Sequence, residues 1–361
     1  MALTVKTLWT MENTTKLAAI GEKLESKFPE WLVTTAKSFF RGIGQVMFQC
    51  NAWTGFLFLI GIVWGAYAEG NGLVAWGALT GCAASSFAGY ITRNRGCAVS
   101  DGKQGLWGFN GTLVGCAFPT FLGNTWMMWA GLLICAMMTT WVRRGFNNVM
   151  APWHINSLTF PFVFMTWFFL LCAREMKGLP STGMDVPSLE FAIHSHEDYT
   201  FGLLVKAWLK NISQVFLIDS WVTGIFFIIA LAISNRYACL WACVASALSL
   251  ATAIVFQAGG VSIDSGLYGF SAVLTGIAVG ATFYKPSWIG AIWTSFGVIL
   301  TVFIQAGMNA FFAPWGMATL TGPFCIATWL LLLPRIKLDD RFNPDMSDWQ
   351  HDLKSRKQIF K

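Results

Sequence analysis

Long apolar runs separated by short polar breaks occupy most of this 361-residue chain. Ten of these runs approach the length of a helix that crosses the hydrocarbon core of a membrane, which takes roughly 20 residues. The first five predicted spans are 52–68, 72–91, 105–123, 125–142 and 156–173. The second five are 221–234, 237–257, 266–283, 287–306 and 317–334. The pattern predicts an all-α integral membrane protein with ten transmembrane helices.

Two further apolar pieces, 38–48 and 204–217, are too short to span, and one precedes each set of five spans. Each carries one glutamine near its end, Gln45 in the first piece and Gln214 in the second. Irregular backbone at membrane depth survives only where protein buries it or water wets it. We therefore predict two re-entrant half-helices that meet along a pathway through the protein.

Three sequence motifs occur twice, in the same order and at nearly the same spacing. The Gln-Val pair at 45 recurs at 214, Gly-Leu-Trp-Gly-Phe at 105 recurs as Gly-Leu-Tyr-Gly-Phe at 266, and Ala-Pro-Trp at 151 recurs at 313. The last motif is followed in both copies by Leu-Thr-x-Pro-Phe. Collinear matches of this kind indicate a duplicated unit. Because five spans precede the second copy, it must run upside down, so we predict inverted repeats.

The predicted organisation is an N-terminal tail (1–37), a first repeat (38–173), a linker (174–203), a second repeat (204–335) and a C-terminal tail (336–361). Lysine and arginine gather in the loops that this arrangement places on the side of the N-terminus, among them Arg95, Arg143, Arg144 and Lys285. The positive-inside rule then predicts cytoplasmic termini and an outer linker. The expected location is a cell membrane, either a plasma membrane or a bacterial inner membrane, with the lipid bilayer as a partner.

Composition narrows the functional classes. Only 12% of the residues are charged, against about 25% in a typical soluble domain. The formal net charge of +6 is spread over short loops and tails, so we predict no nucleic-acid partner. The nine cysteines have no zinc or redox spacing, and we predict no metal or cofactor. A metal or pH role for His194 and His196 in the linker is the alternative to a solvated loop.

The predicted spans contain almost no ionisable residues, which argues for an uncharged solute that is not coupled to ions. Glutamine and threonine side chains can hydrogen-bond such a solute, and phenyl faces can form flat apolar walls around it. Helical spacing places three pairs on shared faces: Gln45 with Phe48, Phe109 with Leu113, and Phe270 with Leu274. In the alternative interpretation, the phenylalanines are core residues, and Thr159 and Thr321 bond the helix backbone loosened by the prolines that follow.

The duplicated motifs resemble those of the urea transporter family, over about residues 38–335. The resemblance implies a homotrimer with one pore per subunit and passive, channel-like permeation of urea through a narrow filter. In that family, aromatic slots at the two ends of the filter grip the flat faces of urea. A ladder of oxygen atoms accepts its amide protons.

Carried over by motif, Phe48 and Phe109 line one slot and Phe270 lines the other. The resemblance places Leu113 and Leu274 at the constriction beside Val46 and Val215, the two glutamines at the slots, and the two threonines at the middle. The chain departs from the pattern at Leu217, which matches Phe48, so the two slots are expected to differ in affinity. The full set of expected substrate-binding residues is Gln45, Phe48, Phe109, Leu113, Thr159, Gln214, Val215, Leu217, Phe270, Leu274 and Thr321.

Other functions stay open at this point. One is a pore for another small neutral solute, such as water, glycerol or a short amide. Another is an ion-coupled secondary transporter built on inverted repeats. An ammonium channel would be expected to hold paired histidines within its spans, whereas only His154 lies near one. We do not expect an enzyme, because the spans contain no catalytic dyad or metal cluster.

Overall fold

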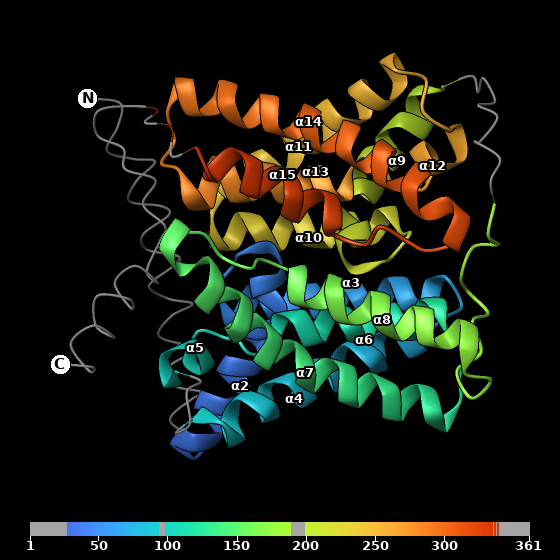
Figure 1. The fold of residues 1–361 in the computed structure, drawn as a ribbon. Coiled ribbons are helices and arrows are strands. Elements are labelled where there is room, and N and C mark those ends of the chain that lie inside the picture. Colours follow the sequence, from blue (N-terminus) through green and yellow to red (C-terminus); the bar gives the residue numbers. More distant parts are fainter. Residues whose placement is uncertain (1–26, 94–97, 189–198, 335, 337, 339–361) are drawn as a thin grey trace, which may run out of the picture.

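The computed structural model describes residues 27–93, 98–188, 199–334, 336 and 338. Within these ranges every regular element is helical (Figure 1). The chain is thus consistent with the predicted helical membrane protein. The pair His194 and His196, most of the N-terminal tail and nearly all of the C-terminal tail lie outside the described residues.

The two halves of the chain contain the same kinds of element in the same order, except that the second half has an additional π-helical segment. The first half consists of α2 (Glu30–Gly44), η1 (Gln45–Met47), α3 (Ala52–Ala68), α4 (Leu73–Ile91), α5 (Val99–Lys103), α6 (Phe109–Phe121), α7 (Trp126–Met150), η3 (Ala151–Trp153) and α8 (Phe160–Glu175). The second half consists of α9 (Phe201–Ser213), η4 (Gln214–Phe216), α10 (Trp221–Ser234), α11 (Arg236–Val255), α12 (Gly260–Asp264), α13 (Phe270–Ile277), the π-helical η5 (Ala278–Phe283), α14 (Trp288–Phe312), η6 (Ala313–Trp315) and α15 (Gly322–Leu332).

The helix bounds agree well with the apolar runs at some places and less well at others. Predicted spans 52–68 and 221–234 coincide with α3 and α10, whereas α7 and α14 continue well past their predicted ends. By length and apolarity alone, two described helices suffice to cross a membrane, α11 and Trp288–Trp315. Two helix pairs satisfy the same criteria only jointly, and each pair is bent by 73° at a short break.

These two bends, the first elbow (residues 45–51) and the second elbow (residues 214–220), have the same local cause. Phe48 ends η1 in the left-handed region at a φ of 63°, and its N–H donates to the Gln45 carbonyl at 3.1 Å. Leu217 ends η4 in the same way at a φ of 57°. The next helices begin on polar caps, because Asn51 accepts from the Trp53 N–H and Ser220 from the Thr223 N–H.

The helices on either side of each elbow are held close by a glycine. A Cβ on Gly55 of α3 would lie 1.7 Å from the Phe40 carbonyl oxygen of α2. A Cβ on Gly224 of α10 would lie 2.3 Å from the Leu209 carbonyl oxygen of α9. No real side chain is tolerated at such distances, so glycine sets how closely each short helix packs against the following one.

The two halves meet where α3 packs against α10, and both helices lie in the middle of the molecule (Figure 1). Two reciprocal hydrogen bonds cross this contact. The Thr54 hydroxyl donates to the Ala230 carbonyl at 3.1 Å, and the Thr223 hydroxyl donates to the Gly61 carbonyl at 2.8 Å. In Figure 1, α2 and α5 lie at one end of the helix stack, whereas α9 and α12 lie toward the other end.

Aromatic residues divide between the interior and the surface. Phe58, Phe216 and Phe227 are fully buried in the core between the halves, with ring centroids 4.9–5.7 Å apart. Many tryptophans are instead exposed on the outside, as aromatic residues are at membrane–water interfaces; they include Trp53, Trp64, Trp76, Trp126, Trp221, Trp288 and Trp315.

The close approach at the first elbow makes a stability prediction. Gly55→Ala should lower the free energy of unfolding by more than about 2 kcal/mol, because the new Cβ overlaps the Phe40 carbonyl. The matched control is Gly145→Ala in α7, where an added Cβ meets no atom within 4 Å. The control should keep or slightly raise stability, since alanine favours a helix. Melting curves of the detergent-solubilised proteins compare the variants, and equal melting temperatures would contradict the proposed close packing.

Candidate functional site

The elbows place the two glutamines in equivalent surroundings. Gln45 Nε2 donates to the Gln104 carbonyl at 3.0 Å, and Gln214 Nε2 donates to the Ser265 carbonyl at 2.8 Å. Both acceptors precede a glycine in the left-handed region, Gly105 or Gly266, which the sequence motif repeats. Each glutamine is half-buried, and its Oε1 has no hydrogen-bond partner among the described residues.

The predicted apolar residues lie beside these amides in matched positions. Phe109 and Phe270 are the first residues of α6 and α13, and they are 7% and 8% exposed. One turn later in each helix, Leu113 and Leu274 are fully buried. The helical spacing of these two pairs is therefore as expected from the sequence. Val46 and Val215, next to the glutamines, are also fully buried.

The expected shared face of Gln45 and Phe48 is not a regular helix face. The chain leaves the helical conformation at Phe48, so the side chain departs in a direction that helical spacing does not predict. The Phe48 ring instead packs edge-on against Phe283 and Phe324, with centroids 5.9 and 6.0 Å away. Both of these partners belong to the second half of the chain. Phe48 thus brings the first elbow into contact with the second half.

The two threonines meet at the junction of the halves. Thr159 and Thr321 are each 2% exposed, and their hydroxyl oxygens are 2.6 Å apart. The Cys325 sulfur lies 3.4 Å from the Thr159 hydroxyl. Neither threonine side chain caps the helix that follows it, so the alternative of a bond to the loosened backbone is not what the structure has.

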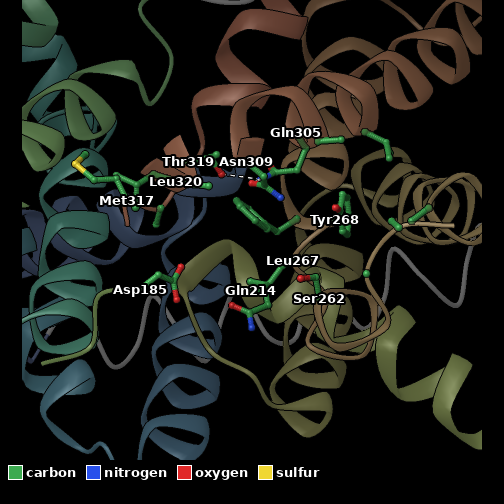
Figure 2. A pocket seen from close by; sticks show the side chains of 18 of the residues that line it. Asp185, Gln214, Ser262, Leu267, Tyr268, Gln305, Asn309, Met317, Thr319 and Leu320 are labelled. Carbon is green, nitrogen blue, oxygen red and sulfur yellow. Dashed lines mark hydrogen bonds between the residues drawn. The ribbon is translucent and has the colours of Figure 1, made fainter. Parts of the chain in front are cut away.

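A cavity of about 1060 Å³ brings together much of the second half of the predicted site. Its lining includes Gln214, Val215, Leu217, Phe270 and Thr321. Figure 2 shows Gln214 below the opening, with Thr319 and Leu320 of the segment before α15 above it. Leu274 and the predicted residues of the first half do not line this cavity. Thr321 links it to the middle of the molecule through its contact with Thr159.

The charged residues near the elbows have structural partners. Arg41 donates to the Lys103 carbonyl at 2.8 Å near the first elbow. Near the second elbow, Lys210 lies 3.1 Å from the Asp219 carboxylate and 3.6 Å from that of Asp264. The surroundings of the two elbows therefore differ in charge, because Asp264 occupies the position that matches Lys103.

Glu69, directly after α3, adds a carboxylate to the rim of the cavity. Partial burial raises its pKa to about 7, and the nearby negative charge of Asp219 acts in the same direction. The Asp219 backbone N–H and the Lys210 charge act the other way. Asp185 also lines this cavity, together with the uncharged hydrogen-bonding side chains of Gln214 and Thr321.

Several lining residues were not anticipated from the sequence. Gln305 and Asn309 of α14 and Thr319 lie along the cavity, together with Glu69. Gln305 lies near the end of the apolar run 287–306, and an amide in such a run needs a polar partner. That position was the one sequence signal that could have indicated it as a site residue. The carbonyl partners of Gln45 and Gln214 left no signal in their own side chains, because any residue supplies a carbonyl.

Comparison with known proteins places this architecture in context. A family model described as "Urea transporter" matches residues 36–336. Urea transporter 1 from sheep (Ovis aries) is 27% identical over 317 residues, which cover 85% of this chain and 77% of the sheep protein. Urea transporter 1 from rat (Rattus norvegicus) is 25% identical over 315 residues, again 85% of this chain and 77% of its own length. The family match spans both halves and both elbows, and the chain belongs to the urea transporter family.

Proposed function

We propose that the protein conducts urea passively across a membrane through a filter between the two elbows. Family membership supports urea transport. One structural observation supports the route: the Gln45 and Gln214 amides occupy equivalent positions in the two elbows and make equivalent hydrogen bonds. Each amide nitrogen is held by a backbone carbonyl, which orients the side chain and leaves Oε1 to accept from a solute N–H. Matched acceptors on two inverted elbows suit a molecule that passes both in turn.

The walls beside the glutamines suit a thin, flat solute. Phe109 and Phe270 offer apolar faces. Contact with them costs urea little hydration free energy, because its N–H and C=O groups lie in the plane of the molecule and not on its faces. A hydrated ion or a thicker solute would lose hydration there without replacement. We assign Phe48 and Phe109 to the first slot, and Leu217 and Phe270 to the second.

At the middle of the path we assign solute contact to Thr159 and Thr321. Their hydroxyls bond each other at 2.6 Å, and each can accept a further hydrogen bond. Water would be kept from this middle part of the path by four buried aliphatic side chains, Leu113, Leu274, Val46 and Val215. Among the residues that the structure describes, no buried side chain is charged, which favours passive conduction over ion coupling.

We further propose ten transmembrane helices and two re-entrant half-helices in two inverted repeats, with cytoplasmic termini. The order of elements, which the two halves share apart from η5, supports the duplication, and the opposite ends at which α2 and α9 lie support the inversion (Figure 1). The repeat boundaries, the homotrimer and the cell-membrane location follow from the sequence and the family and are part of the same proposal.

This topology predicts which residues can be labelled from outside the cell. In a variant lacking the native cysteines, Ser181→Cys in the linker should react with an impermeant thiol reagent in intact cells. Lys285→Cys, between η5 and α14, should react only after the cells are opened. Labelling of the second position in intact cells would contradict the inverted topology.

The proposed filter predicts the behaviour of glutamine variants. Gln45→Leu and Gln214→Leu should each lower urea flux about tenfold, the factor that one hydrogen bond of about 1.4 kcal/mol carries. Gln104→Ala is the matched control, because it keeps the backbone carbonyl that holds Gln45. Stopped-flow light scattering on proteoliposomes measures the flux, and wild-type rates in the double Leu variant would show that the glutamines do not contact the solute.

The same assay separates the alternatives. Wild-type protein should pass urea much faster than glycerol, whereas a general pore for neutral solutes would not discriminate. A sodium or proton gradient should not drive urea accumulation, whereas an ion-coupled transporter would require it. Failure to conduct urea would overturn the proposed function.

Glu69 predicts how stability changes with pH. Its pKa of about 7 in the folded protein exceeds the ordinary value of 4.5, so the folded protein retains a proton that the unfolded chain has released. The free energy of unfolding should therefore fall as the pH rises from 4.5 to 7. Glu69→Gln should reduce the loss of melting temperature between pH 5 and pH 8, whereas Glu175→Gln, outside the cavity, should not. An equal loss in wild type and Glu69→Gln would contradict the raised pKa.

A further inference from the structure

A cluster of three polar side chains lies on the cavity wall beyond the second slot. Gln305 and Asn309 are one turn apart on α14, and Thr319 precedes the α15 helix. Gln305 Nε2 donates to Asn309 Oδ1 at 2.8 Å and to Thr319 Oγ1 at 2.6 Å. Figure 2 shows these three side chains grouped on one side of the cavity, with Gln214 on the other side in this view. We call this cluster the outer site.

The outer site has an unfilled hydrogen-bonding position. Gln305 is 2% exposed, and its Oε1 has no partner in the part of the chain that the structure describes. Its amide nitrogen is fully engaged with two acceptors, so the carbonyl oxygen is held in place rather than free to rotate away. A buried amide oxygen without a donor costs free energy, and a ligand N–H at this position would remove that cost.

The first half of the chain fills the equivalent position differently. Counted back from the repeated Ala-Pro-Trp motif, Gln305 corresponds to Arg143, whose guanidinium lies 2.9 Å from the Asp101 carboxylate. Asp101 corresponds in turn to Ser262, which lines the cavity. An internal ion pair in the first half is thus replaced by two neutral residues in the second.

The other members of the cluster show the same contrast. Asn309 corresponds to Asn147 and Thr319 to Ser157. In the first half, Asn147 Oδ1 accepts from the Ser157 backbone N–H at 2.9 Å. The Arg143 guanidinium pairs with Asp101 instead, and it lies 5.9 Å from the Phe109 ring centroid. In the second half, Gln305 links these two positions and turns its carbonyl oxygen toward no protein donor.

We propose that the outer site binds one planar, neutral amide, of which urea is the smallest example, before it enters the second slot. Gln305 Oε1 accepts an N–H of the solute, and the Asn309 amide supplies an N–H for its carbonyl oxygen. A neutral solute fits because the three side chains of the outer site are themselves uncharged and offer only hydrogen-bonding groups. The inference rests on the proposed urea conduction, and it adds a binding step that the first half lacks.

The test measures the initial rate of urea flux as a function of urea concentration in proteoliposomes. Gln305→Met keeps the length of the side chain and removes the acceptor. We expect the half-saturating urea concentration to rise about fivefold, the factor that a hydrogen bond of about 1 kcal/mol carries, with the maximal flux retained within twofold. Phe256→Leu, on the same cavity but outside the cluster, should change neither quantity.

A second variant keeps the test valid if Gln305→Met fails to fold. The double variant Ser262→Asp, Gln305→Arg rebuilds in the second half the ion pair that Asp101 and Arg143 form in the first. It should fold, with a melting temperature near that of wild type, and should also raise the half-saturating concentration.

An unchanged half-saturating concentration in the folded variants would overturn the inference. A fall in maximal flux alone would also overturn it and would assign Gln305 the structural role of holding Thr319 in place. If the wild-type protein conducts no urea, the proposed function fails first, and that result is distinguishable because it precedes any comparison of variants.

Discussion

The structure depends on satisfying backbone hydrogen bonds where a helix stops inside the protein. Each unpaired N–H or C=O there costs several kcal/mol, so a chain can break only where substitutes are at hand. At the first elbow the Phe48 and Gln49 N–H groups turn back to the Gln45 and Gly44 carbonyls, and Asn51 caps the next helix. The Gln45 amide then satisfies a carbonyl from another loop. The groups that make the break tolerable are therefore also groups of the candidate site.

Much of the fold can be predicted from the sequence, because apolar runs and repeated motifs are local signals. The starts of α3 and α10 follow from their caps at Asn51 and Ser220, whereas α2 begins at Glu30, well before the predicted apolar piece 38–48. Helical spacing predicts the wrong direction for the Phe48 side chain, because it assumes an unbroken helix. The backbone instead leaves the helix at Phe48, whose φ is 63°. Left-handed conformations at non-glycine residues have no reliable signal in a single sequence.

The candidate site was only partly predictable for a related reason. Residues such as Gln214 and Phe270 stand out because they recur, so repetition identified them. The contact between Thr159 and Thr321 depends on how two distant segments pack, which spacing within one segment does not encode. Gln305 was overlooked because its counterpart is Arg143. Likeness between the halves indicates the residues that they share, but not those at which they differ.

The reciprocal threonine bonds between α3 and α10 have a consequence for how the protein is made. Thr223 finds its acceptor 162 positions back along the chain, in a helix that leaves the ribosome much earlier. At typical synthesis rates of roughly 5–20 residues per second, the first half waits about 8 to 32 seconds for that partner. During this interval the Thr54 hydroxyl lacks the Ala230 carbonyl that accepts its hydrogen bond, and α3 is not packed against α10. Pairing of the two halves through these bonds is therefore a late step, which begins only once α10 has been made.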